Sequence, residues 1–184
     1  MAKKILRYLK GTRDLGLFLP DVGDEATLVV WSDAGYAGIG TSKAQSGLFL
    51  MWAGAPLLWR SSRQTVSALS TAEAELCAAA LAWQIAEGIR ALLEELGIRL
   101  EPIKLLLDND AALAIAEQGS NWRTRYFGVR GARIQEEQLR GRLILGHEPT
   151  KTMVADALTK LPAADVLRNL QDAMGGIFPP PCWS

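Results

Sequence analysis

Two apolar segments of the chain run into aspartates, whose carboxylates are suited to holding a cation. ATLVVWSDAG (26–35) is predicted to be a strand that closes on Asp33, and IKLLLDND (103–110) reaches Asp108. Each aspartate alone is an ordinary turn residue, and Asp110 is well placed to cap the next helix. If the two strands are neighbours in one sheet, their acids meet. Like charges at close range repel unless a cation lies between them.

A third acid comes from a helix predicted between Ser70 and Leu96, stopped by Gly97. At about 100° per residue, Glu75 falls on the apolar face that must lie on the sheet, together with Ala79, Ala82, Ala86, Ile89, Leu93 and Leu96. Glu73 falls on the polar face, and we expect it to reach back to the Ser70 amide in a capping box. A carboxylate on a buried face normally has a partner, either a bound cation or an arginine.

Asp156 in TMVADALTK and His147 in LILGHEPT complete the candidates for chemistry. Taken alone, Asp156 is an ordinary helix residue. His147 is the only histidine in the chain, and a lone histidine is more often a surface or packing residue than a catalyst.

The composition is that of one globular domain. The chain has 184 residues, of which 49% are hydrophobic and 22% charged. We find no apolar run long enough for a membrane span and no secretory signal, so no membrane partner is expected. Cys77 and Cys182 lack metal-binding spacing, which fits an intracellular protein of the cytoplasm or nucleus. Because 20 basic and 20 acidic residues cancel, nucleic-acid binding must depend on local clusters.

The elements that must position these acids predict a mixed α/β fold. The expected helices cover residues 3–10, 70–96, 111–118, about 126–139, and 152–160. The expected strands cover residues 26–35, 46–54, 56–62, 103–108 and 142–148, with a tight connection at Gly54, Ala55 and Pro56. Three strands with short joins, followed by alternating helix and strand, predict a mixed sheet with helices packed on it.

Together these motifs resemble the ribonuclease H domain of reverse transcriptases from copia-type LTR retrotransposons, from about Lys3 to Leu161. ILRYLKGTRDLGL resembles the connector after the polymerase part, and SDAGYAG resembles the first acid motif. TSKAQSGLFLMWAGAPLLWRSSRQTVSALSTAEAEL resembles the following strands and the start of the first helix. LLDNDAALAIA resembles the third acid motif, and EPTKTMVADALTKLP the last. Each motif alone is weak, but their order and spacing make the resemblance specific.

The resemblance implies a ribonuclease H-like fold, with a five-stranded sheet of three antiparallel strands followed by two parallel ones. It divides the chain into a connector remnant (1–22), the ribonuclease H-like domain (23–162), and a C-terminal helix with a disordered proline-rich tail (163–184). It also implies a metal-binding catalytic quartet of Asp33, Glu75, Asp108 and Asp156. His147 is expected to assist proton transfer or product departure.

The implied activity is cleavage of the RNA strand of RNA–DNA hybrids. Oxygen-only ligands favour Mg²⁺ or Mn²⁺ over zinc, and two such ions about 3.5–4 Å apart form the usual clamp on a phosphodiester. The expected partners are the hybrid and the reverse transcriptase part of a parent polyprotein. The expected phosphate contacts are Lys43, Arg60, Arg63, Arg123, Arg125 and Arg130.

One segment departs from the family pattern. Where relatives carry histidines and an aspartate, RTRYFGVRGARIQEE has Gly128, Gly131 and Ala132. Its arginines, which continue with Arg133, Arg140 and Arg142, are alternatively a solvated face balanced by nearby glutamates. The competing functions are therefore a catalytically inactive nucleic-acid-binding remnant, a domesticated module, or a DNA-cutting relative such as an integrase or resolvase.

Overall fold

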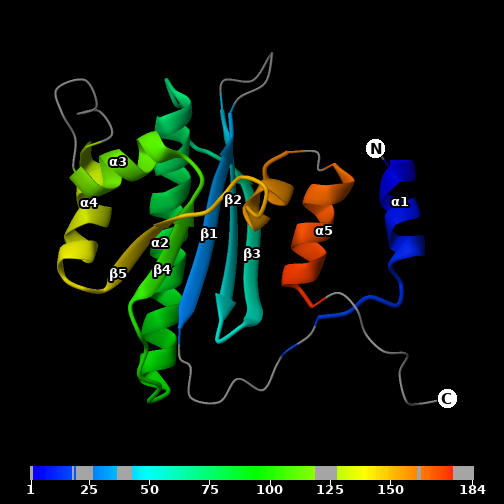
Figure 1. The fold of residues 1–184 in the computed structure, drawn as a ribbon, viewed down its shortest axis with the longest axis horizontal. Helices are drawn as coiled ribbons and strands as arrows, with labels where there is room; N and C mark the ends of the chain where they lie inside the picture. The colour runs from blue at the N-terminus through cyan, green and yellow to red at the C-terminus, as the bar shows by residue number, and fades with distance from the viewer. Residues whose placement is uncertain are drawn as a thin grey trace.

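A computed structural model describes residues 2–17, 19, 27–36, 43–118, 128–160 and 163–175. Its centre is a five-stranded sheet with the strand order β3-β2-β1-β4-β5 (Figure 1). The strands are β1 (Leu28–Gly35), β2 (Gln45–Trp52), β3 (Ala55–Arg63), β4 (Ile103–Leu107) and β5 (Leu143–His147). β1, β2 and β3 pair antiparallel, whereas β4 is parallel to both β1 and β5. The predicted mixed sheet is confirmed.

The described residues also form helices. They are α1 (Ala2–Gly11), α2 (Thr71–Glu95), α3 (Asp110–Gln118), α4 (Gly128–Leu139), the 3₁₀ helix η2 (Val154–Leu158) and α5 (Ala164–Ala173). α2 packs on the sheet, and α3 and α4 lie on the same side of it (Figure 1). α4 forms in the segment that departs from the family pattern. The expected helix at 152–160 is instead the short η2.

The apolar face of α2 forms the core. Glu75, Ala79, Ala82, Ala86 and Leu93 on the predicted face are buried, and the alanines pack against strand residues that include Leu28, Val30, Leu105 and Leu107. Leu96 was wrongly assigned to this face, since it is 69% exposed. It follows the last helical residue, where the chain turns away through Gly97 at a φ of +83°. By length and composition α2 also suffices to cross a membrane, but here it is the core helix of a globular domain.

Two local predictions need correction. The hairpin between β2 and β3 turns at Ala53 and Gly54, with φ of 49° and 79°, as a tight two-residue turn requires. Pro56 therefore lies inside β3, next to a shift in strand register. Asn109, not Asp110, caps α3, because its Oδ1 accepts the Ala112 N–H at 3.0 Å.

α1 and α5 lie to one side of the sheet (Figure 1). α1 has no buried residue, and its Tyr8 hydroxyl accepts a hydrogen bond from Gln171 of α5 at 3.4 Å. The C-terminal helix expected after residue 162 is α5. The proline-rich tail from residue 176 lies outside the described residues, and the boundary at residue 22 remains a prediction.

Candidate active site

The parallel pairing of β1 and β4 brings the first two acids together. Trp31 lies opposite Leu106, and the same register two residues further on places Asp33 beside Asp108. One carboxylate oxygen from each of Asp33, Asp108 and Asp156 lies within 4.8 Å of the others. Asp33 is only 2% exposed. It lies inside β1, which continues to Gly35 and does not close on the acid as predicted.

Glu75 lies beside this group without belonging to the three acids that converge most closely. Burial, together with the negative charges of Asp33 and Asp108, raises the pKa of Glu75 to about 9. Among the described residues, Glu75 Oε2 has no hydrogen-bond partner. A buried carboxylate oxygen without a donor, next to other acids, is suited to a cation.

The start of α2 is fixed in a way that holds Glu75 in place. Ser70 Oγ accepts the Glu73 N–H at 3.1 Å, as predicted for the N-cap. The Glu73 carboxylate accepts the Leu69 amide at 2.6 Å, not the Ser70 amide. Because it folds back in this way, Glu73 is buried, and its expected exposure to water is wrong. Gln64 Nε2 donates to the carbonyl oxygen of Ala74 at 2.8 Å, which ties β3 to the helix next to Glu75.

η2 delivers Asp156 by lying directly on two glycines of the sheet. A Cβ added to Gly47 would lie 2.6 Å from Thr159 Cγ2 and 2.9 Å from the Ala155 carbonyl oxygen. A Cβ added to Gly35 would lie 2.6 Å from the Thr159 carbonyl oxygen. Only glycine permits this close approach. Ser61 of β3 also donates to the Leu158 carbonyl oxygen, so the end of η2 is attached to the sheet.

Thr159 and Lys160 contact the acids, and the sequence analysis singled out neither. Thr159 Oγ1 donates to Asp33 Oδ2. Lys160 Nζ lies 2.7 Å from Asp156 Oδ1 and 3.9 Å from Asp33 Oδ2. Burial raises the pKa of Asp33 to about 6, against the opposing effects of the Thr159 hydrogen bond and the Lys160 charge. The available signal was their spacing, three and four residues after Asp156 in TMVADALTK.

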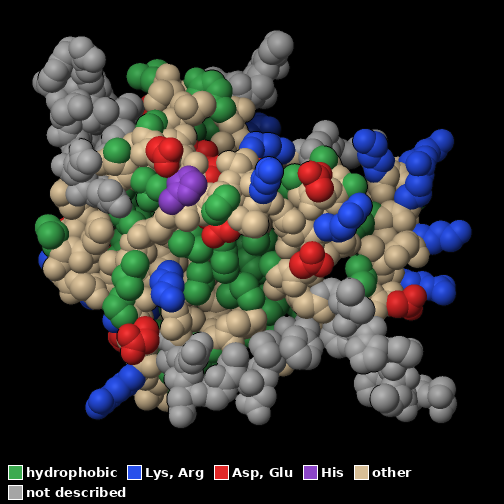
Figure 2. Space-filling model, viewed as in Figure 1, with side chains coloured by type: hydrophobic (Ala, Val, Ile, Leu, Met, Phe, Trp, Pro, Cys, Tyr) green, Lys and Arg blue, Asp and Glu red, His purple; other side chains and the backbone are tan. Residues whose placement is uncertain are grey.

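His147 and Asp108 lie at the same edge of the sheet. The β4–β5 register places His147 opposite Leu107, the residue before Asp108. His147 Nε2 lies 3.5 Å from Asp110 Oδ1, and the imidazole is about half exposed. Thr150 Oγ1 donates to Asp108 Oδ2 at 3.3 Å. On the face shown in Figure 2, the histidine lies next to acidic side chains, in reach of solvent.

Comparison with known proteins decides the fold family. Solved structures that superpose on the chain include the N-terminal RNase H domain of Rv2228c from Mycobacterium tuberculosis, with a TM-score of 0.55 and 14% identity over 81% of this chain and 99% of that one. LC11-RNase H1 in complex with an RNA/DNA hybrid gives a TM-score of 0.53 and 16% identity over 76% of this chain and 99% of that one. The chain has the ribonuclease H fold.

The sequence relatives of this ribonuclease H-like chain are retrovirus-related Pol polyproteins of copia-type transposons, which confirms the resemblance. The polyprotein from transposon RE2 of Arabidopsis thaliana is 31% identical over 182 residues, which is 97% of this chain. The chain spans 12% of that polyprotein's length. No family model matches the chain.

The arginines of the ribonuclease H-like chain fall into two groups. Arg133, Arg140 and Arg142 form ion pairs with glutamates, which are Glu136, Glu137 and Glu87. Glu137 is fully buried, so these arginines stabilise the packing of α4 and match the alternative of a balanced face. Among the described residues, no acid forms an ion pair with Arg60, Arg63 or Arg130. Lys43 is exposed before β2. Arg123 and Arg125 lie outside the described residues.

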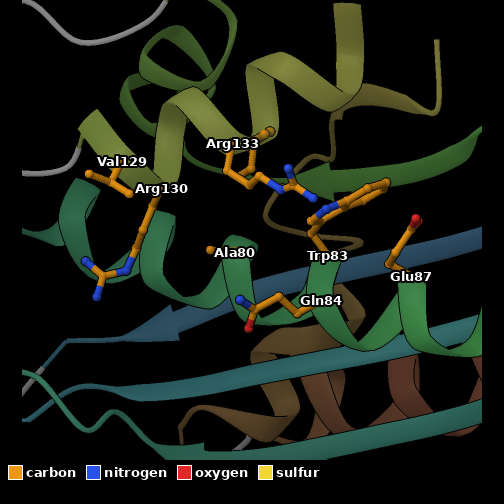
Figure 3. A pocket seen from close by; sticks show the side chains of 8 residues that line it. Ala80, Trp83, Gln84, Glu87, Val129, Arg130 and Arg133 are labelled. Carbon is orange, nitrogen blue, oxygen red and sulfur yellow. The ribbon is translucent and has the colours of Figure 1, made fainter. Parts of the chain in front are cut away.

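These unpaired arginines line two hollows beside α2 that share Arg130. One, of about 340 Å³, lies between α2 and α4, where Arg130 and Arg133 project from α4 beside Trp83 and Gln84 (Figure 3). The other, of about 330 Å³, is lined by residues that include Arg60 and Arg63 of β3 and again Arg130. None of the four acids lines either hollow. The basic side chains are thus arranged along a groove separate from the carboxylates.

Proposed function

We propose that this chain is a metal-dependent endoribonuclease that cleaves the RNA strand of RNA–DNA hybrids. The proposal is carried by one observation, the convergence of Asp33, Asp108 and Asp156 within 4.8 Å with Glu75 buried beside them. It is supported by the fold, which is shared with a ribonuclease H1 solved in complex with an RNA/DNA hybrid. It is further supported by the relatives, which are Pol polyproteins of transposons.

The residues present fit a divalent cation. All four proposed ligands, Asp33, Glu75, Asp108 and Asp156, offer carboxylate oxygens, the donors that Mg²⁺ and Mn²⁺ prefer. Glu75 Oε2 lacks a hydrogen-bond partner among the described residues, and an ammonium group already lies within 3.9 Å of two of the acids. We infer that the site takes two ions. When bound, they supply Lewis acidity for attack by water on the phosphodiester and positive charge for the leaving oxygen.

The side chains of this centre have separable roles. The carboxylates hold the cations and are not the nucleophile. Glu75, with its pKa raised to about 9, carries a proton at neutral pH in the metal-free protein and releases it when a cation takes the proton's place. His147 is half exposed at the rim beside Asp110. There it exchanges protons with solvent and assists proton transfer or departure of the cleaved strand.

The hybrid is held by its backbone, because cleavage of this kind needs no reading of base sequence. Arg60, Arg63 and Arg130, which line the hollows, and Lys43, which is exposed before β2, are the proposed phosphate contacts. Arg123 and Arg125 are also proposed as phosphate contacts, on the basis of the sequence alone. The reverse transcriptase part of a longer polyprotein is a second proposed partner, supported by the small share of each relative that the chain covers.

The test is a cleavage assay on a hybrid with a labelled RNA strand. With Mg²⁺ we expect fragments ending in 3′-hydroxyl and 5′-phosphate, no cleavage in excess chelator or with zinc alone, and an intact DNA duplex. Asp108→Asn is the inactive control. Binding of the hybrid without cleavage contradicts the proposal in favour of an inactive remnant or domesticated module. Equal cleavage of duplex DNA favours an integrase-like or resolvase-like enzyme.

A further inference from the structure

Lys160 lies where a cation would bind. Its ammonium is 2.7 Å from Asp156 Oδ1 and 3.9 Å from Asp33 Oδ2. Its backbone amide donates to the Asp156 carbonyl oxygen at 3.3 Å, so the Lys160 backbone lies one turn after the acid that its side chain contacts. Among the described residues, Lys160 is the basic side chain that forms ion pairs with the converging aspartates. Arg133 of α4, and Arg140 and Arg142 after it, are paired with glutamates elsewhere.

The metal-free centre needs such a charge. Three carboxylates within 4.8 Å of one another, two of them almost fully buried, repel each other when no cation separates them. The ammonium of Lys160 offsets part of this repulsion, and the Thr159 hydroxyl supplies a donor to Asp33. The two neighbours differ, however, in how firmly they are held.

Thr159 is fixed, whereas Lys160 is able to leave. Thr159 packs against the sheet at Gly35 and Gly47. The Lys160 side chain is 54% exposed and has a flexible four-carbon stem, so its ammonium can move into solvent while η2 and Asp156 stay in place. A divalent ion ligated by Asp33 and Asp156 and the Lys160 ammonium compete for the same carboxylate oxygens.

We propose that Lys160 is a tethered counter-cation that neutralises the metal-free centre and is displaced when metal binds. It is therefore a positioning residue that sets the metal concentration at which the centre loads. This inference rests on the proposed function, since it assumes that the carboxylates bind a divalent cation.

The test compares metal binding and stability in the full chain. Lys160→Met and Lys160→Gln both remove the charge, and glutamine keeps a donor for Asp156, which protects the experiment if the methionine variant folds poorly. Lys104→Met removes an exposed lysine of β4 and serves as the control. Calorimetric titration with Mn²⁺ alone gives the affinity. Thermal melting with chelator and with saturating Mn²⁺ gives the stability of each state.

We expect both Lys160 variants to bind Mn²⁺ about five- to tenfold more tightly than wild type, the scale of one lost charged contact. They should melt below wild type in chelator and level with it in saturating Mn²⁺, and Lys104→Met should match wild type throughout. Unchanged or weaker Mn²⁺ binding by the Lys160 variants overturns the inference, because Lys160 would then support the ligands and not compete with the metal. If wild type binds no Mn²⁺ and cleaves no hybrid, the proposed function fails first.

Discussion

Glu75 is the residue whose environment differs most from that of an ordinary carboxylate. Burial and the charges of Asp33 and Asp108 raise its pKa from 4.5 to about 9 in the folded, metal-free protein. Below pH 4.5 the carboxyl is protonated in both the folded and the unfolded state. Between pH 4.5 and 9 only the unfolded state releases the proton. The contribution of the Glu75 carboxyl to the free energy of unfolding is therefore progressively lost as the pH rises. Asp33 acts in the same direction between pH 3.8 and about 6.

Removing this carboxylate should therefore stabilise the metal-free protein more at higher pH. We expect the free energy of unfolding of Glu75→Gln, measured in chelator by chemical denaturation, to rise relative to wild type between pH 5 and pH 8. Each pH unit inside this window changes the stability by at most about 1.36 kcal/mol, so a gain of up to about 4 kcal/mol over these three units is expected. A constant difference between the two proteins across this range would mean that Glu75 is charged or solvated in the metal-free centre.

His147 should contribute to turnover and not to binding. Because it is half exposed and 3.5 Å from Asp110, His147→Ala should leave the affinity for hybrid unchanged. The rate of cleavage under single-turnover conditions should fall. The usual contribution of a general acid or base, about 10²–10⁴-fold, is the upper limit of this effect. Multiple-turnover assays report any added effect on product departure. If the variant cleaves at the wild-type rate in both assays, His147 is a surface residue with no role in turnover.

At the scale of elements, the contact of η2 with the sheet decides where Asp156 lies. We expect Gly47→Ala to displace η2, because the new Cβ meets Thr159 Cγ2 at 2.6 Å and the Ala155 carbonyl oxygen at 2.9 Å. The protein should lose about 1–3 kcal/mol of stability, and Mg²⁺-dependent cleavage should fall more than in His147→Ala.

Gly88→Ala is the matched control for this substitution. Gly88 lies in α2 with nothing within 4 Å of an added Cβ, so alanine should raise the melting temperature through helix propensity and leave cleavage unchanged. If Gly47→Ala melts and cleaves like wild type, the close approach of η2 to β2 does not position Asp156.

The local elements could be predicted because their signals are local. The 3.6-residue period placed Glu75 on the buried face of α2, and Ser70 proved to be the N-cap. The same reasoning failed for Glu73 and Leu96. Glu73 is buried because its carboxylate folds back on the Leu69 amide, and Leu96 is exposed because the helix has ended. A helical wheel contains neither effect.

Tertiary contacts were beyond the reach of sequence patterns. Spacing alone does not bring Asp156 to Asp33, because their meeting depends on the close packing of η2 on two glycines. That pairing entered as an implication of the family resemblance. Likewise, Arg142 looked available for phosphate until the fold paired it with Glu87 of α2 and the buried Glu137 of α4.

At the scale of the whole molecule, the centre exists only when the domain is folded. Its four acids come from β1, α2, the end of β4 and η2. No single helix or strand carries more than one of them. Metal binding should therefore stabilise the fold as a unit. Loss of a ligand should abolish the metal response while leaving the fold intact.

The most direct measurement of the central claim compares two buried glutamates of α2 that are two residues apart. Glu75→Gln and Glu73→Gln, each checked for folding by thermal melting, are assayed with Mg²⁺ on the same labelled hybrid. Glu75→Gln should be folded, bind Mg²⁺ poorly and be almost inactive. Glu73→Gln should cleave like wild type, since a glutamine oxygen still accepts the Leu69 amide that Glu73 now accepts. An active Glu75→Gln beside an inactive Glu73→Gln would contradict the assignment of the carboxylate centre.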